Sequence, residues 1–182
     1  ILLVDSLHKK KELKIRIYAM ISNSKDNLDY FLKKGAIKTP QLNVSPVKVY
    51  VDGALVSSGA TLKEPYHDDP NNYGKLITNP DDLKKLATRI AKANFQMNTH
   101  AIGDSTVKLL IDTYSKVLEN KEDPRWRIEH SQIIDLEDME GFNNKILPSV
   151  QPTHATSDMY WAGERLGRSR IHRAYAYRSL KE

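Results

Sequence analysis

Short apolar segments alternate with amphipathic helical segments along most of this chain, and this alternation limits the fold more than any other feature of the sequence. The predicted strands lie near residues 13–19, 47–51, 95–99, 127–130 and 147–152. Between them, hydrophobic residues recur at helical spacing, most clearly in the segments 79–93 and 107–118. Strands that alternate with helices of about 10–15 residues are typical of parallel βαβ units. The sequence therefore predicts an α/β fold built on a parallel sheet.

Cap and turn residues mark where several of these elements begin and end. Asn79 is expected to cap a helix that begins at Pro80, because an asparagine side chain can accept hydrogen bonds from the free backbone N–H groups of the first turn. Proline suits the first helical position because it lacks a backbone N–H group, which would have no partner there. Gly35 is expected to close a shorter helix over residues 27–34. Residues 54–79 form a long polar segment without periodicity, and a loop of this length is usually functional.

The length of the chain bears on whether the sheet closes into a barrel. A (β/α)8 barrel of the TIM type needs roughly 250 residues, whereas this chain has 182. It starts at Ile1 without a methionine and stops at Glu182 inside an apparent element. We therefore expect a piece of a longer protein, with residues 1–182 as an incomplete (β/α) barrel domain truncated at both ends. An open five-stranded sheet is the alternative.

Composition argues against several classes of function. The net charge is +5 and the isoelectric point is near 9.2, but the lysine clusters are scattered along apparent helices, with no basic stripe interleaved with aromatic residues. We therefore expect no nucleic-acid partner. No apolar run approaches the ~18 residues of a membrane span, so we expect no membrane insertion. The lack of cysteine excludes disulfides and thiolate metal sites and leaves the cellular compartment open.

Two histidines occupy matching positions at the ends of predicted strands. His100 follows the strand 95–99, and His130 ends the strand 127–130 about thirty residues later. The carboxyl ends of neighbouring parallel strands meet at one edge of the sheet, and imidazole is the commonest protein ligand for zinc-like ions. One such histidine alone is more often a strand-end residue bonded to a backbone carbonyl. Two at matching positions favour a shared metal site.

Lys48 lies within a strand whose other residues include several valines. Alternation places the valines at 47, 49 and 51 under the helices and turns Lys48, Tyr50 and Asp52 toward the other face of the sheet. A lysine inside a barrel is costly unless it is paired, has a shifted pKa or is chemically modified. The alternative is an amine that bonds neighbouring carboxylates. Function therefore depends on whether Lys48 lies beside the two histidines.

The other candidate residues carry less specific signals. Asp104 follows Gly103 at a predicted helix start, where a capping role is commoner than ligand binding. His154 lies on the predicted loop after the last strand, where it either contacts substrate or belongs to the surface. His67 is expected to be solvent-exposed. The motifs of serine hydrolases, phosphate-binding loops and dinucleotide-binding folds are absent.

Four segments together resemble the amidohydrolase superfamily, in the branch known as amidohydrolase family 3. They are Val47-Lys-Val-Tyr-Val-Asp-Gly-Ala54, Thr99-His-Ala-Ile-Gly-Asp104, Arg127-Ile-Glu-His-Ser-Gln132 and Ser149-Val-Gln-Pro-Thr-His-Ala-Thr-Ser-Asp158. Their order and spacing cover most of residues 45–180. The resemblance implies a partial (β/α)8 TIM-type barrel, approximately strands 3 to 7.

The same resemblance implies the site and the reaction. One or two divalent metal ions, zinc first among them, would be held by Lys48, His100 and His130, and the lysine is carbamylated in many relatives. Asp52 and His154 would shape the substrate pocket. The implied activity is hydrolysis of a carbon–nitrogen bond in an amide, an N-acyl compound or a cyclic amide by a metal-activated water.

The chain also departs from the family pattern. The His-x-His pair of the first barrel strand and the aspartate of the eighth strand, which serves as general base, are both absent from this sequence. After Asp52-Gly53 the family commonly has Ala-Leu-Gly-Ser-Arg, whereas this chain has Ala54-Leu-Val-Ser-Ser58. We therefore expect no catalytic residue within this fragment, and no appreciable turnover from it alone.

Two other functions stay open on the sequence alone. Without metal, a barrel-derived segment would serve as a scaffold or interaction module, and with metal but another substrate it would belong to an ester or lactone hydrolase. The expected partner is a small-molecule substrate. A homo-oligomer is also left open, because the exposed edges of an unclosed sheet favour association.

Overall fold

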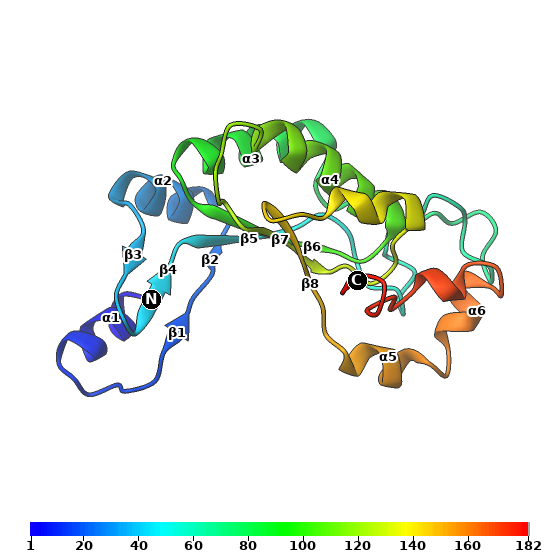
Figure 1. Cartoon of the computed structure of the whole chain (residues 1–182), viewed down its shortest axis with the longest axis horizontal. Helices are drawn as coiled ribbons and strands as arrows, with labels where there is room; N and C mark the ends of the chain where they lie inside the picture. Colours follow the sequence, from blue (N-terminus) through cyan, green and yellow to red (C-terminus); the bar gives the residue numbers. More distant parts are fainter. Residues whose placement is uncertain (182) are drawn as a thin grey trace.

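A five-stranded parallel sheet forms the centre of the computed structural model, which describes residues 1–181 (Figure 1). The strands follow one another in the order β2-β5-β6-β7-β8, and every neighbouring pair is parallel. Their bounds are β2 Ile21–Ser22, β5 Pro46–Tyr50, β6 Gln96–Ala101, β7 Trp126–His130 and β8 Ile146–Ser149. The predicted α/β class with a parallel sheet is confirmed.

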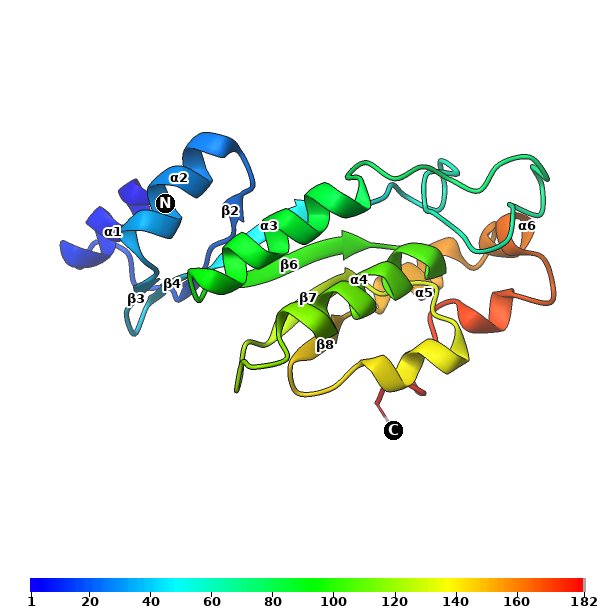
Figure 2. The same cartoon turned by 90° about the horizontal axis from the view of Figure 1, so that it is seen from above.

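Two long helices, α3 (Pro80–Lys92) and α4 (Asp104–Val117), lie side by side across one face of this sheet (Figures 1 and 2). The start of α3 is as predicted, because Asn79 Oδ1 accepts the backbone N–H of Asp82 at 2.9 Å and Pro80 is the first helical residue. For α4 the cap is Gly103, and Asp104 is its first helical residue rather than the predicted cap. Within residues 1–181 no helix is both long and apolar enough to traverse a membrane.

The two faces of the sheet differ in chemistry. Apolar side chains point toward the helices, with Val47, Val49, Met97, Trp126 and Ile128 all at most 1% exposed. The opposite face carries polar side chains in register across β5, β6, β7 and β8, namely Lys48, Tyr50, Asn98, His100, Arg127, Glu129 and Ser149. A sheet with one apolar and one polar face has its main core under the helices, and this leaves the polar face for the site.

The N-terminal part forms an arm at one side of the sheet (Figure 1). It contains α1 (Leu2–Lys9), α2 (Lys25–Lys34) and a small sheet in the order β1-β4-β3, with β1 Ile17–Tyr18, β3 Ile37–Lys38 and β4 Leu42–Val44. The predicted strand 13–19 is corrected, because regular pairing begins only at Ile17. The strands β2, β3 and β4 were missed, since strands of two or three residues carry no periodic signal.

Residues 53–79 pack with the C-terminal segment into a second, smaller core. The helices α6 (Ala162–Leu166) and η2 (Ile171–Arg173) contribute to this core, whereas η1 (Leu136–Gly141) packs on α4 and α5 (Thr153–Asp158) follows β8. The buried members of this core are Leu55, Ala60, Leu62, Tyr66, Ile102, Ile133, Ala162, Leu166 and Ala174. The helix predicted over residues 136–142 is a 3-10 helix, η1. The segment around His154, predicted as a loop, is the helix α5. This second core holds the long loop against the carboxyl ends of the strands.

Candidate metal centre

Three histidines gather at the carboxyl ends of β6, β7 and β8. The ring centroids of His100 and His130 are 4.5 Å apart, and those of His130 and His154 are 5.8 Å apart. His100 and His130 come from neighbouring parallel strands, whereas His154 comes from α5, one short turn beyond β8. The structure thus brings together the two histidines that the sequence singled out as ligands, and it places the third beside them.

The orientation of His130 depends on an unusual backbone. Simple alternation along β7 would turn His130 to the same face as Trp126 and Ile128, under the helices. Instead His130 and Ser131 have φ angles of 74° and 43°, in the left-handed region that residues other than glycine rarely adopt. This turn brings the His130 ring against His100. Strained backbone of this kind is concentrated at functional sites, and sequence periodicity gives no sign of it.

Lys48 belongs to the same group of side chains. It lies on β5 with its Nζ atom 4.9 Å from the centroid of the Tyr50 ring, and that ring is in turn 5.5 Å from the ring of His100. Burial lowers the pKa of Lys48, Arg127 adds to the effect and Glu129 opposes it. The charge of Lys48 acts on both His100 and His130, so the three groups share one electrostatic environment.

Both histidines are held in the neutral form at pH 7. Burial lowers the pKa of His130 to about 4, and the positive charges of His100, Lys48 and His154 add to this effect. Burial also lowers the pKa of His100, against the opposing attraction of Asp52. A neutral imidazole keeps a lone pair on one ring nitrogen, which is the form that binds a metal ion.

The nitrogens of this site fit a metal ion in one specific respect. The Nδ1 atom of His130 is buried and has no hydrogen-bond partner within residues 1–181. A buried polar atom without a partner is rare in folded proteins, and a bound metal ion would be one partner for this lone pair. In the same described range no group of three or more His, Asp or Glu side chains has the arrangement of a metal site, so the candidate set consists of two imidazoles and Lys48.

Asp52 lies beneath the site rather than at its surface. Its side chain is fully buried and accepts backbone N–H groups of Thr61, Ile102 and Gly103 at 2.9–3.1 Å, and its Oδ1 atom is 3.6 Å from His100 Nε2. Because it is buried, Asp52 can shape a substrate pocket only through the residues that it holds in place. The carboxylate ties the ends of β5 and β6 to the long loop.

His154 has a network of its own. Its Nε2 atom is 3.0 Å from Gln151 Oε1, and its Nδ1 atom is 3.7 Å from Asp158. Asp158 in turn accepts hydrogen bonds from Tyr175 at 2.7 Å and from Gln132 at 3.2 Å. Local sequence patterns could not assign Gln132 and Tyr175 to this network, because they lie 26 and 17 positions from Asp158. His67, by contrast, is exposed as predicted.

An ion pair lies deeper on the polar face, next to Lys48. Arg127 Nε and a terminal nitrogen donate to Glu129 Oε1 at 2.9 and 2.8 Å, and Ser149 donates to Glu129 Oε2 at 2.8 Å. Glu129 is therefore already bonded on both oxygens. It acts on Lys48 through its charge, and the structure records no hydrogen bond between them within residues 1–181.

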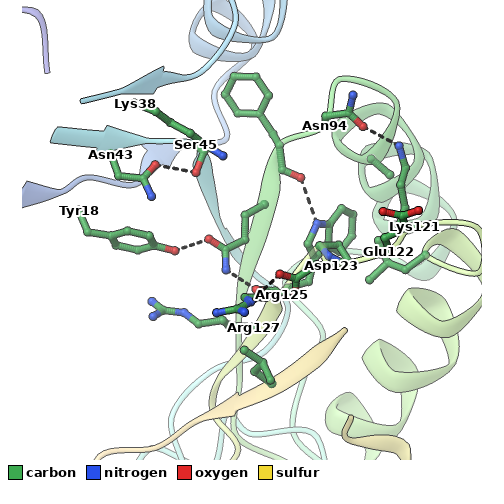
Figure 3. A pocket seen from close by; sticks show the side chains of 17 residues that line it. Tyr18, Lys38, Asn43, Ser45, Asn94, Lys121, Glu122, Asp123, Arg125 and Arg127 are labelled. Carbon is green, nitrogen blue, oxygen red and sulfur yellow. Dashed lines mark hydrogen bonds and ion pairs between the residues drawn. The ribbon is translucent and has the colours of Figure 1, made fainter. Parts of the chain in front are cut away.

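A cavity of about 610 Å³ lies at the other end of the strands (Figure 3). Its lining includes Tyr18 of β1, Gln96 at the start of β6 and the residues just before β7. Its polar groups bond to one another, because the Tyr18 hydroxyl donates to Gln96 and the Gln96 amide donates to the Arg125 carbonyl. Active sites of parallel α/β folds lie at the carboxyl ends of the strands, so this cavity is separate from the candidate site.

The chain belongs to the amidohydrolase family, whose sequence model matches residues 3–182. It is 32% identical over 176 residues to Protein LONG AFTER FAR-RED 3 of Arabidopsis thaliana, covering 94% of this chain and 30% of that protein. It is 31% identical over 142 residues to YtcJ of Bacillus subtilis, whose name describes it as an amidohydrolase, covering 78% of this chain and 27% of YtcJ.

Two solved structures have the same fold over nearly the whole chain. Both are described as uncharacterized metal-dependent hydrolases, one from Pyrococcus horikoshii and one from Pyrococcus furiosus. Each superposes with a TM-score of 0.86 over 98% of this chain, at 27% and 30% sequence identity respectively. The match covers 36% and 37% of the two archaeal chains. This chain thus spans about a third of the length of its relatives.

Proposed function

We propose that this chain is part of a metal-dependent hydrolase that cleaves carbon–nitrogen bonds in amides, N-acyl compounds or cyclic amides. The observation that carries the proposal is the 4.5 Å approach of His100 and His130, in the electrostatic neighbourhood of Lys48, at the carboxyl edge of a parallel sheet. Membership of the amidohydrolase family and the likeness to two metal-dependent hydrolases support it.

The proposed ligands are His100, His130 and Lys48. Zinc is the proposed ion, one or two per molecule, because neutral imidazoles are among its preferred ligands. A bound divalent ion supplies Lewis acidity and a coordinated water of lowered pKa. Burial lowers the pKa of Lys48 and so increases the share of its neutral amine, which adds to carbon dioxide with loss of a proton and becomes a carbamate with two ligand oxygens.

Two further residues have roles in this proposal. His154 is the proposed substrate contact, because it is part-exposed, lies beside His130 and is oriented by Gln151 and Asp158. Asp52 acts on the substrate pocket only indirectly, through His100 and the loop 54–79 that it fixes. Substrate itself is a small molecule.

We place the five parallel strands as approximately strands 3 to 7 of a (β/α)8 barrel, with residues 1–182 as an incomplete domain. The sequential strand order, the helices on one face and the polar residues on the other support this placement. The His-x-His pair and the strand-8 aspartate of the family are absent from this sequence. The chain alone is therefore expected to have no turnover.

Metal content tests the proposal. The full-length protein and its His100→Ala/His130→Ala variant are titrated with zinc, with His172→Ala as the control because His172 is exposed on η2. Binding that is lost only in the double variant supports the site. A folded full-length protein that takes up no zinc, or equal binding by all three proteins, would overturn the proposal and favour a scaffold. A panel of amides, esters and lactones on a metal-loaded full-length protein decides the bond cleaved.

A further inference from the structure

Asp52 is held in place through both of its carboxylate oxygens. It is 0% exposed, and its Oδ2 atom accepts the backbone N–H groups of Gly103 at 2.9 Å and Thr61 at 3.1 Å. Its Oδ1 atom accepts the N–H of Ile102 at 3.1 Å. Three donors from two segments therefore hold both oxygens, so the carboxylate cannot rotate without breaking backbone hydrogen bonds.

The free side of this carboxylate faces His100. The Nε2 atom of His100 is 3.6 Å from Asp52 Oδ1 and 3.5 Å from the carbonyl oxygen of Gly53. Both oxygens are acceptors only. In a neutral imidazole one nitrogen carries the proton and the other a lone pair, and a lone pair on Nε2 would face two other lone-pair oxygens. The proton therefore belongs on Nε2.

We infer that Asp52, together with the Gly53 carbonyl, is a positioning residue that fixes the tautomer of His100, with the proton on Nε2 and the lone pair on Nδ1. The inference rests on the proposed function in one respect, which is that Nδ1 is then the nitrogen available to a metal ion. The tautomer itself is a property of the metal-free chain. An outer carboxylate that orients a ligand histidine typically changes metal affinity by about 10–100-fold when it is removed.

Asp104 provides a matched control for Asp52. It is 3% exposed, and its Oδ1 atom accepts the backbone N–H groups of Lys63 and Ser105, both at 2.9 Å. Like Asp52, it ties the long loop to the segment that follows β6. The structure records no contact between Asp104 and a histidine ring within residues 1–181, so Asp104→Asn reproduces the loss of a buried carboxylate without touching His100.

The Asp52→Asn variant changes the chemistry next to His100 while keeping the shape. Its amide oxygen replaces the oxygen that accepts from Gly103 and Thr61, and its NH2 group then faces His100 Nε2. The Ile102 N–H loses its 3.1 Å acceptor in this variant and keeps the longer contact of 3.4 Å to the remaining oxygen. A donor at that place favours the lone pair on Nε2 and moves the proton to Nδ1. Titration with Co²⁺, followed by its absorption spectrum, is expected to show about 10–100-fold weaker binding for Asp52→Asn and unchanged binding for Asp104→Asn.

The deciding measurement uses the metal-free wild-type chain. Nitrogen-15 NMR at neutral pH identifies which ring nitrogen of His100 carries the proton, and the His100→Gln variant assigns the signal. We expect the Nε2–H form in the wild type and in Asp104→Asn, and the Nδ1–H form in Asp52→Asn. The Nδ1–H form in the wild type would overturn the inference even if Asp52→Asn failed to fold. An unchanged tautomer in a folded Asp52→Asn would also overturn it.

The two proposals fail in different ways. If the tautomer is as expected and changes in Asp52→Asn, but the full-length protein binds no Co²⁺, the positioning role stands and the proposed function falls. If Co²⁺ binds equally to the wild type and Asp52→Asn while the tautomer differs from the one inferred, the metal site stands and the role of Asp52 is refuted.

Discussion

The imidazole rings of His100 and His130 approach to 4.5 Å between centroids, although each comes from a different strand of the sheet. The strand register contributes to this approach, because His130 pairs with Ala101, the neighbour of His100. The left-handed backbone at His130 also contributes, because it turns the His130 side chain toward His100. Two imidazoles that lie together in a half-buried place are each harder to protonate, so the stability of the fold depends on pH.

The first prediction is that the chain loses stability as the pH falls from about 6.5 toward 4. His130 has a pKa of about 4 in the folded chain, below its usual value of about 6.5. The unfolded chain therefore binds more protons in this range, so the stabilisation is complete above about pH 6.5 and is lost as the pH falls through the folded pKa. Because the ring is partly exposed, we expect a loss of about 1–2 kcal/mol rather than the full value of the shift.

Urea unfolding at pH 7.0, 5.5 and 4.5 measures this loss, with His130→Gln as the comparison. The variant is expected to have a shallower dependence on pH than the wild type over this range, whereas His172→Ala, which alters an exposed histidine, should follow the wild type. Parallel curves for the wild type and His130→Gln would show that His130 does not cause the pH dependence.

A second prediction concerns Lys63, which holds the long loop to η1. Its Nζ atom donates to Asp138 at 2.7 Å and to Asp135 at 3.0 Å. Burial alone would lower the pKa of Lys63, but the hydrogen bonds to these two carboxylates outweigh it and raise the pKa. Lys63→Ala leaves the buried Asp138 carboxylate without its cation, so we expect a destabilisation of about 1–2 kcal/mol.

The control for this prediction is Lys108→Ala. Lys108 pairs with Asp112 at 2.6 Å on the exposed surface of α4, and an exposed pair contributes only about 0.3–0.5 kcal/mol. Chemical denaturation of both variants gives the comparison. Equal effects of the two substitutions would mean that burial of Asp138 adds nothing to the ion pair.

Sequence periodicity was sufficient to predict the regular elements of the fold. The parallel sheet, α3 with its Asn79 cap, and the strand-end position of His100 all follow from alternation and cap chemistry. The side-chain orientation of His130 does not, because it depends on φ angles that a histidine adopts only under constraint from its surroundings.

The burial of Asp52 also could not be predicted from the sequence. Its position after a strand, before Gly53, is typical of a turn or pocket residue. Its actual partners are backbone groups of Thr61, Ile102 and Gly103, up to 51 positions away. Contacts of this range follow from how the loop folds over the sheet, and local patterns carry no information about them.

A third prediction concerns the close contact between the long loop and the start of α4. A Cβ atom on Gly103 would lie 2.0 Å from the carbonyl oxygen of Thr61, a backbone atom that cannot rotate away. Gly103→Ala is therefore expected to destabilise the chain by about 2–3 kcal/mol and to loosen residues 54–79.

Gly163→Ala in α6, where a Cβ meets nothing within 4 Å, should be neutral or stabilising by up to about 1 kcal/mol. Urea unfolding together with limited proteolysis of the loop measures both effects, and a neutral Gly103→Ala would show that the loop does not rest on this glycine.

The last prediction is that Lys48 forms a carbamate when zinc and bicarbonate are present. Burial lowers the pKa of Lys48, so a larger share of its amine is neutral than for an exposed lysine, and only the neutral amine adds to carbon dioxide. Carbon-13 NMR with labelled bicarbonate should show one carbamate signal in the wild type and none in Lys48→Met. Lys116→Met, which removes an exposed lysine of α4, should keep the signal. A signal that survives in Lys48→Met would assign the carbamate to another amine, and the absence of any signal from a zinc-loaded wild type would leave Lys48 as an unmodified amine beside the two histidines.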